Sequence, residues 1–278
     1  MKRVNCSSKN ANSLYCSIKY KASIISYQVF GSGNELLLAF PGYGKDATSL
    51  SILGDTFGNR FKVISIDVFY HGLSTWEESQ LPNADDWKQI VTAILVENGN
   101  PQKFSVFGYS IGGRVATFTA FHFAERVNLL WLAAATGIGN EGFYTFAVGT
   151  SLGNFMFSRF VNRPTPIFAF AKLLGSTLQG FIIRKIDTFE KRNLLYKRWR
   201  VLKNFSCSKK QLQQRLNANG CRVVLLYGKK DVVVNYKAAI AFAQKLNHPI
   251  LLLPDAGHHL LDNTTLERIK GEAVFSEH

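Results

Sequence analysis

Five apolar runs, separated by segments of helical length, most constrain the fold of this chain of 278 residues. The runs are rich in β-branched residues, leucine and aromatics, and they are mostly apolar throughout, as is typical of parallel strands covered on both faces. Such alternation predicts an α/β fold with a mostly parallel central sheet flanked by helices. The five predicted strands are Phe61 to Ile66, Lys103 to Phe107, Val127 to Ala134, Arg222 to Tyr227 and Pro249 to Leu253.

Two earlier runs, Ser23 to Phe30 and Glu35 to Phe40, are close enough to pair as a hairpin around Gly31-Ser32-Gly33. Helices are predicted between the strands, where apolar residues recur at helical spacing or acidic residues mark a helix start. They cover Asn83 to Glu97, the segment that follows Ser110, Tyr236 to Leu246 and Thr264 to Lys270.

The alternation stops between Thr136 and about Asn219, where no clear strand is found and helical, Phe-rich, basic stretches follow one another. An insertion of this length between two strands predicts a helical lid at the carboxyl edge of the sheet, where open α/β sheets bind ligands. We therefore expect a core domain of residues 1–135 and 220–278 and a lid of residues 136–219.

The turn Gly108-Tyr109-Ser110-Ile111-Gly112 lies between a predicted strand and a predicted helix. This is the order of a nucleophile elbow, in which glycines avoid Cβ clashes and the serine projects at the helix N-terminus. The free N–H groups and the helix dipole favour negative charge there. Ser110 is thus the predicted nucleophile. The alternatives are an ordinary glycine-rich turn or a dinucleotide-binding loop.

With this turn the chain resembles the α/β-hydrolase superfamily over nearly its whole length. The segment Leu36 to Gly44 resembles the oxyanion-hole loop of that family, with Pro41 where many members have histidine. The resemblance implies that the backbone N–H groups of Tyr43 and Ile111 hold the oxyanion. Without the resemblance, Pro41-Gly42 is only a tight turn.

The segment Asp67 to Ser74 resembles another family motif, Asp-x-Pro-Gly-His-Gly-x-Ser. Phe69 and Tyr70 replace the Pro-Gly pair, a departure that is expected to reshape the loop. The resemblance implies a structural role for His71, because its family counterpart is not the general base.

The superfamily order of catalytic residues is serine, then acid, then histidine. Gly228-Lys229-Lys230-Asp231 resembles its acid turn and implies Asp231 as the acid. Gly257-His258, after the last predicted strand, resembles its Gly-His turn and implies His258 as the base. His259 is a local rival, but the family base directly follows the glycine. Asp255 is expected to shape the turn.

A serine is a weak nucleophile near neutral pH and needs a base that a carboxylate orients. Ser110, His258 and Asp231 therefore predict acyl transfer to water, with no cofactor and no metal. The layout resembles single-domain esterases with a helical lid, including the pimeloyl-carrier-protein methyl ester esterases. That resemblance implies a serine hydrolase of a small or medium acyl ester.

Other functions stay open, because the same triad hydrolyses acyl-CoA or acyl-carrier-protein thioesters and carbon–carbon bonds. A non-catalytic ligand-binding member of the fold is the alternative from another class. Haloalkane dehalogenases are disfavoured, because their nucleophile is aspartate and this elbow has Ser110.

The formal net charge of +14 is concentrated between Arg159 and Arg215, where the sequence has fourteen lysines and arginines but only two acidic residues, Asp187 and Glu190. Either the basic side chains are solvated, or they recognise an anionic group. Candidates are a carboxylated substrate, acyl-CoA phosphates, an acidic carrier protein or an anionic membrane surface. No nucleic-acid motif accompanies the charge. The predicted helical face there comprises Leu178, Ile182, Ile186 and Phe189, beside Arg184, Lys185, Lys191, Arg192 and the cluster Tyr196 to Arg200.

The four cysteines form no CxxC motif, which favours free thiols in a reducing compartment and a cytoplasmic protein. A bridge between Cys6 and Cys16 is allowed, although nothing in the sequence requires it. The basic N-terminus leads into no apolar core, so no secretory signal is expected. No apolar run approaches the roughly 20 residues that span a bilayer, so no transmembrane segment is expected either.

Overall fold

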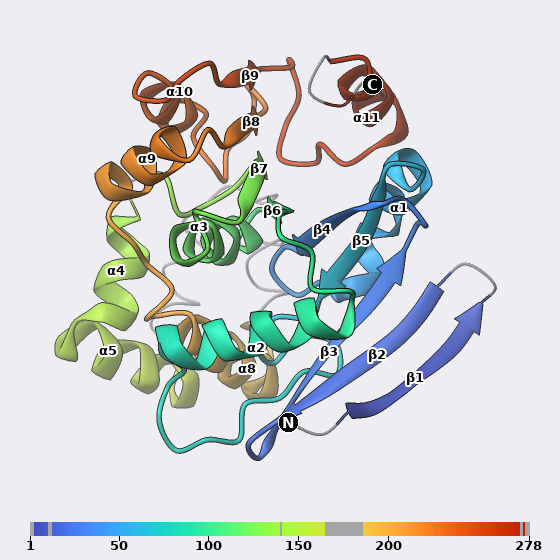
Figure 1. Cartoon of the computed structure of the whole chain (residues 1–278). Helices are drawn as coiled ribbons and strands as arrows, with labels where there is room; N and C mark the ends of the chain where they lie inside the picture. Colours follow the sequence, from blue (N-terminus) through green and yellow to red (C-terminus); the bar gives the residue numbers. More distant parts are fainter. Residues whose placement is uncertain (1–2, 11–12, 140, 165–185, 273–274, 276–278) are drawn as a thin grey trace. The chain divides into compact units, whose positions relative to one another are not determined.

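The apolar runs form one sheet in the computed structural model, which describes residues 3–10, 13–139, 141–164, 186–272 and 275 (Figure 1). Nine strands of the described residues lie in the order β1-β2-β3-β5-β4-β6-β7-β8-β9. The strands from β4 to β9 run parallel, which confirms the predicted mostly parallel α/β sheet. These six are β4 (Glu35–Phe40), β5 (Phe61–Ile66), β6 (Phe104–Tyr109), β7 (Val127–Ala133), β8 (Arg222–Leu226) and β9 (Ile250–Leu252).

The predicted hairpin between the first two runs is wrong. β3 (Ser23–Phe30) pairs antiparallel with β5, and β5 lies between β3 and β4. The glycines around Ser32 do not make a hairpin turn, because they cross the chain that leads into β5. A Cβ on Gly33 would lie 2.0 Å from the carbonyl carbon of Arg60, and the Gly33 N–H donates to Gly58 O at 2.9 Å. The glycines therefore serve a close backbone crossing.

Two N-terminal strands that the sequence analysis did not predict extend the sheet. β1 (Arg3–Asn10) and β2 (Ser13–Tyr20) pair antiparallel, and β2 continues onto β3. Cys6 and Cys16 form a disulfide between β1 and β2, so the expectation of four free thiols is wrong for this pair. Cys207 and Cys221 are free, as predicted. Because disulfides are typical of oxidising compartments, this bond argues against the predicted cytoplasmic location, which remains a prediction.

Helices cover both faces of the parallel strands. α1 (Ser51–Phe57), which follows the short helix η1 (Ala47–Leu50), and α11 (Asn263–Lys270) contact each other and share one core cluster with the sheet. α2 (Ala84–Glu97) and α3 (Gly112–His122) cover the opposite face. There Phe40 contacts Trp87 of α2, while its neighbour Ala39 points into the first cluster. α9 (Lys209–Ala218) packs on α3, and α10 (Lys237–Ala243) contacts β9.

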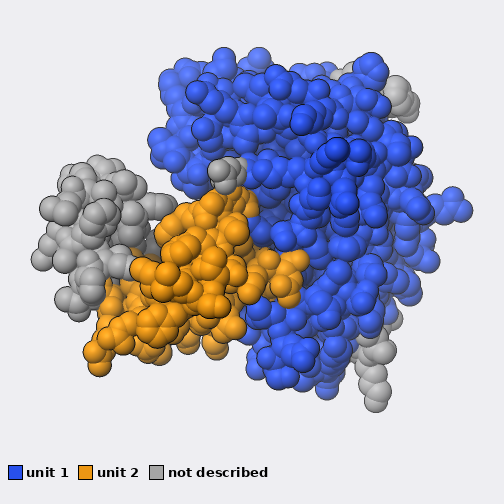
Figure 2. All heavy atoms as spheres, turned by 90° about the vertical axis from the view of Figure 1, so that its left-hand side faces the viewer, with its two compact units in different colours: residues 1–140, 205–278 blue, residues 141–204 orange. Residues whose placement is uncertain are grey.

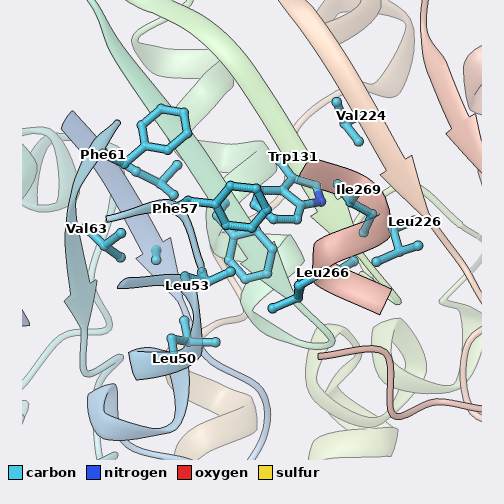
Figure 3. Close-up of a cluster of buried hydrophobic side chains, with 14 of the residues drawn as sticks. Leu50, Leu53, Phe57, Phe61, Val63, Trp131, Val224, Leu226, Leu266 and Ile269 are labelled. Atoms are coloured by element: carbon cyan, nitrogen blue, oxygen red, sulfur yellow. The ribbon is translucent and has the colours of Figure 1, made fainter. Parts of the chain in front are cut away.

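The core cluster beneath α1 and α11 is built around aromatic rings (Figure 3). The Trp131 ring lies 5.3 Å from that of Phe57 and 4.8 Å from that of Phe107, with edge-to-face geometry at both contacts. Such pairs add to the stabilisation from burial alone. The Trp131 indole N–H is buried and has no hydrogen-bond partner among the described residues, which reduces the net gain from this side chain.

α2 begins with a capping box that also binds the end of β2. The Asn83 side chain accepts from the Asp86 N–H at 3.0 Å, and the Asp86 carboxylate accepts from the Asn83 N–H at 3.0 Å. The same carboxylate accepts from the Tyr20 hydroxyl at 2.6 Å and from Lys21 Nζ at 2.7 Å. Burial alone would raise the pKa of Asp86, but these hydrogen bonds outweigh it and lower the pKa.

The chain divides into two compact units, which Figure 2 shows in different colours. One comprises residues 1–140 and 205–278 and contains the sheet. The other is Glu141–Asn204, within the range 136–219 that we predict as a lid. Its described helices are α4 (Gly142–Gly149), α5 (Ser151–Asn162) and α8 (Phe189–Val201). Leu178, Ile182, Arg184 and Lys185 of the predicted basic helical face lie outside the described residues.

Within Glu141–Asn204, Arg192 does not lie on a solvated face. Its side chain is buried, and its guanidinium donates to the backbone oxygens of Val161, Ile186 and Asp187 at 2.9 to 3.0 Å. It thereby satisfies backbone carbonyl groups at the end of α5 and just before α8. A helical pattern in the sequence cannot reveal this contact. Neighbouring Lys191 forms an ion pair with Asp187 at 2.8 Å. Part of the positive charge in this unit is therefore structural.

None of the helices in the described part of the chain combines the length and the apolar character that crossing a membrane requires.

We predict that Trp131→Ala lowers the free energy of unfolding by about 3–5 kcal/mol, because it leaves a cavity among aromatic rings. Trp131→Phe keeps most of the ring contacts and removes the unpaired N–H, so its cost is expected to be clearly smaller. Urea denaturation followed by circular dichroism measures both. Equal losses in the two variants would contradict the assigned role of the ring.

Candidate active site

Ser110 stands at a sharp turn between β6 and α3. Its φ of +54° lies in the left-handed region, which serine adopts only where the surrounding structure enforces it. A Cβ on Gly108 would lie 2.6 Å from Ala116 Cβ, and one on Gly112 would lie 2.1 Å from Phe40 O. Both positions therefore exclude any side chain. The close packing of strand, turn and helix is that of a nucleophile elbow.

The structure brings the imidazole of His258 onto this serine. His258 Nε2 lies 3.0 Å from Ser110 Oγ, and His258 Nδ1 lies 2.8 Å from Asp231 Oδ2. An ionised carboxylate only accepts hydrogen bonds, so Nδ1 carries the proton that faces Asp231. That tautomer leaves Nε2 as an acceptor for the serine hydroxyl. The three residues predicted from the sequence thus form one continuous hydrogen-bonded chain.

The Asp231 carboxylate is held by the backbone that follows it. The Asp231 side chain is fully buried, and its Oδ1 accepts from the N–H groups of Val233 and Val234 at 2.7 and 3.0 Å. The turn of the acid and the turn of the histidine are also joined, because Lys230 N donates to Ala256 O at 2.9 Å. Oδ2 is thereby aimed at His258 before any substrate binds.

The two local rivals lie elsewhere. Asp255 forms an exposed ion pair with Lys230 at 2.7 Å, so its carboxylate is engaged at the surface. The His259 ring lies beside that of His258, with 6.3 Å between the ring centres. Among the described residues, it is His258 that reaches the serine oxygen.

Tyr109 is a supporting residue that the sequence analysis did not identify. Its hydroxyl donates to the backbone oxygen of His258 at 2.9 Å, and the two rings lie 5.6 Å apart. Burial, with the nearby charge of Asp231, raises the pKa of Tyr109 to about 12, so the phenol stays protonated and can donate. The variable position before the serine carries no motif signal, and only the fold shows which loop this side chain reaches.

The predicted oxyanion loop lies against the nucleophile turn. A Cβ on Gly42 would lie 3.3 Å from Ser110 Cβ and 3.1 Å from the Tyr109 ring. The absence of a side chain at Gly42 therefore lets the backbone that leads to Tyr43 approach the serine. Ile111 is the N-cap residue of α3, so its amide belongs to the electropositive end of that helix. Both predicted donors thus belong to segments that flank Ser110.

A buried carboxylate holds the loop behind Tyr43. Asp67 accepts from the Ala47 N–H and from the Ser26 hydroxyl, each at 2.6 Å. It also accepts from the Tyr15 hydroxyl at 2.8 Å and from the Leu73 N–H at 3.2 Å. Burial, with the adjacent carboxylate, raises the pKa of Tyr15 to about 12, so this phenol remains a donor. Four donors satisfy a charge that would otherwise be costly to bury.

The loop after Asp67 shows what replaces the family's Pro-Gly pair. Tyr70 adopts a φ of +61°, and its hydroxyl donates to Trp76 O at 2.7 Å, which holds the strained turn. His71 is buried, with Nδ1 3.0 Å from Phe69 O, and its ring contacts that of Tyr43 edge-on. This environment agrees with the structural role that we expect for His71.

Within the part of the chain that the structure describes, no group of three or more histidine, cysteine, aspartate or glutamate side chains is arranged to hold a metal ion. Ser110, His258, Asp231 and the amides that flank them make up the candidate site.

Comparison with known proteins bears on the fold and the family. An uncharacterised protein of Mycobacterium tuberculosis is 27% identical over 119 residues, which span 42% of this chain and only 33% of that protein. A bacterial membrane phospholipase A, described as a virulence factor, has a TM-score of 0.67 at 17% identity, covering 94% of this chain and 85% of its own. An esterase from Thermogutta terrifontis has a TM-score of 0.64 at 18% identity, covering 97% of each chain.

At such low identity the solved structures show a common fold alone. The family model of the alpha/beta hydrolase fold, however, matches residues 35–264, which include Ser110, Asp231 and His258. Because this match extends over most of the 278 residues, the chain belongs to the α/β-hydrolase family.

Proposed function

We propose that this protein is a serine hydrolase that cleaves a carboxylic ester of a small or medium acyl group through an acyl-enzyme intermediate. The single observation that carries the proposal is the chain from Ser110 Oγ to His258 Nε2 at 3.0 Å and from His258 Nδ1 to Asp231 at 2.8 Å. Those distances and that tautomer are what general-base activation of a serine requires.

In the first half of the proposed reaction, Ser110 Oγ attacks the ester carbonyl carbon while its proton passes to His258 Nε2. Asp231 stabilises the imidazolium that forms and does not itself take the proton. The tetrahedral intermediate then collapses, the carbon–oxygen bond to the alcohol breaks, and His258 protonates the departing alcohol. The acyl group remains on Ser110 as an ester.

In the second half, His258 takes a proton from water, which attacks the acyl carbon and forms a second tetrahedral intermediate. The bond to Ser110 Oγ breaks and the serine regains its proton, so one water converts one ester to an acid and an alcohol. The amides of Tyr43 and Ile111 are the proposed donors to both oxyanions. One such donor typically contributes a factor of about 10²–10³ in rate.

Several finer assignments belong to the proposal. The unit Glu141–Asn204 is the proposed lid, within the predicted range 136–219. The substrate is a small molecule, and an acidic carrier protein or an anionic surface is the proposed partner of the basic residues. Neither a metal nor another cofactor is required by the steps above.

We predict that Ser110→Ala abolishes both ester hydrolysis and labelling by a fluorophosphonate probe, because the alanine has no oxygen to phosphonylate. In-gel fluorescence after labelling and the release of p-nitrophenol from a short acyl ester provide the two measurements. An unlabelled wild-type protein would instead favour the non-catalytic, ligand-binding alternative. Persistent labelling of Ser110→Ala would exclude Ser110 as the nucleophile.

Two matched pairs test the roles of the base and the acid. We predict that Asp231→Asn lowers kcat by about 10⁴-fold, because it no longer holds the required imidazole tautomer. Asp255→Asn, a surface substitution in the adjoining turn, is expected to leave kcat nearly unchanged. His258→Ala is likewise expected to be inactive and His259→Ala active. Loss of activity on changing Asp255 or His259, with activity kept on changing Asp231 or His258, would reverse the assignment.

The substrate class is tested by measuring kcat/KM for esters, thioesters and a carbon–carbon bond substrate over a series of acyl lengths. We predict the highest values for esters with short or medium acyl groups. A marked preference for acyl-CoA or acyl-carrier-protein would favour the thioesterase alternative, and cleavage of the carbon–carbon substrate alone would favour that class. All three results depend on the same serine.

A further inference from the structure

The helix α5 is apolar on two opposite sides. Gly153 and Val161 are buried, as expected for the face of a helix that packs inward. Leu152, Phe155 and Met156 nevertheless leave 62%, 61% and 54% of their surface exposed. Their spacing places these three side chains on one face of the helix. Exposed large apolar groups that are contiguous mark an interaction surface more often than a single exposed residue does.

The helix α4 also carries two exposed aromatic residues. Phe143 and Phe146 are 76% and 41% exposed. The end of α4 and the start of α5 pack tightly, because a Cβ on Gly153 would lie 1.9 Å from Phe146 O. The Thr150 side chain caps α5 by accepting from the Gly153 N–H at 3.0 Å. The apolar residues therefore stand on a rigid helical corner, which we call the α4–α5 corner.

Positive charge follows the apolar face along α5. Arg159 is exposed and lies one turn beyond Phe155, on the same side of the helix. Arg163, at the C-cap, is exposed one further turn along, and neither arginine forms an ion pair with a described residue. Between Glu141 and Asn204 the sequence has eleven lysines and arginines against three acidic residues. Even with Arg192 buried and Lys191 paired, the unit remains strongly basic.

We propose that the α4–α5 corner binds the surface of an anionic lipid bilayer. Phe, Leu and Met side chains that reach roughly 5–10 Å into the interface gain burial of apolar area. Arg159 lies one turn, or about 6 Å, along the helix from Phe155 and on the same face, so both side chains reach the same interface. There its guanidinium meets lipid phosphates, while its aliphatic stem extends along the apolar layer.

Exposed apolar side chains on a strongly basic unit are complementary to an anionic bilayer. A bilayer offers acyl chains to the apolar side chains and phosphates to the arginines. The inference specifies the anionic partner named in the proposed function, and it does not depend on catalysis by Ser110.

The test uses full-length protein carrying Ser110→Ala, so that hydrolysis cannot alter the lipid. We expect it to co-sediment with mixed phosphatidylcholine–phosphatidylglycerol vesicles, and to bind pure phosphatidylcholine vesicles much more weakly. Adding Phe155→Ser and Met156→Ser is expected to lower the partition coefficient by about tenfold or more. Adding Arg159→Gln and Arg163→Gln is expected to cause a similar loss and to weaken the salt dependence.

Matched controls come from the unit that contains the sheet. Val96→Ser, on an exposed valine of α2, and Arg268→Gln with Lys270→Gln, on exposed residues of α11, are expected to leave binding unchanged. Circular dichroism verifies that each variant is folded. Absence of binding by the parent protein, or equal binding by the Phe155 and Met156 variant, would overturn the proposal. So would a dimer in sedimentation velocity that this variant abolishes, because the corner would then join two copies of the chain.

Discussion

The arrangement around Ser110 depends on close approach between backbones where ordinary side chains would collide. Gly112 lies against the carbonyl of Phe40, Gly108 against Ala116, and Gly42 against Ser110 itself. The same region holds Ser110 in a left-handed conformation and places the end of β4 beside the start of α3. Close packing thus determines the positions of both Ser110 and the loop that leads to Tyr43.

A second set of contacts brings distant parts of the chain to the same edge of the sheet. Asp231 follows β8 and His258 follows β9, and backbone hydrogen bonds join their two turns. Because parallel strands end at a common edge, residues far apart in sequence meet there. Tyr109 adds a contact from the turn of Ser110 to the turn of His258, so His258 is held from two sides.

The parallel strands and the turn around Ser110 could be predicted because each follows a local pattern, whereas Asp231 and His258 were predicted through their resemblance to α/β-hydrolase motifs. A glycine pair around a serine and a glycine before a histidine are visible without any knowledge of contacts. The crossing of Gly33 over Arg60 is not, since the same glycines suit a hairpin equally well. The Cys6–Cys16 bond and the burial of Arg192 likewise depend on which segments meet in space.

The four hydrogen bonds to Asp67 connect the outer strands of the sheet with the loop beside Ser110. Tyr15 stands on β2, near the outer margin of the sheet, yet its hydroxyl shares one carboxylate with the amide of Ala47, just past Tyr43. A buried carboxylate is destabilised when it loses a hydrogen-bond donor that nothing replaces. Disturbance of β1 and β2 therefore also affects the loop beside Ser110, because β2 and this loop both donate to Asp67. The N-terminal hairpin therefore supports the loop beside Ser110 from the margin of the sheet.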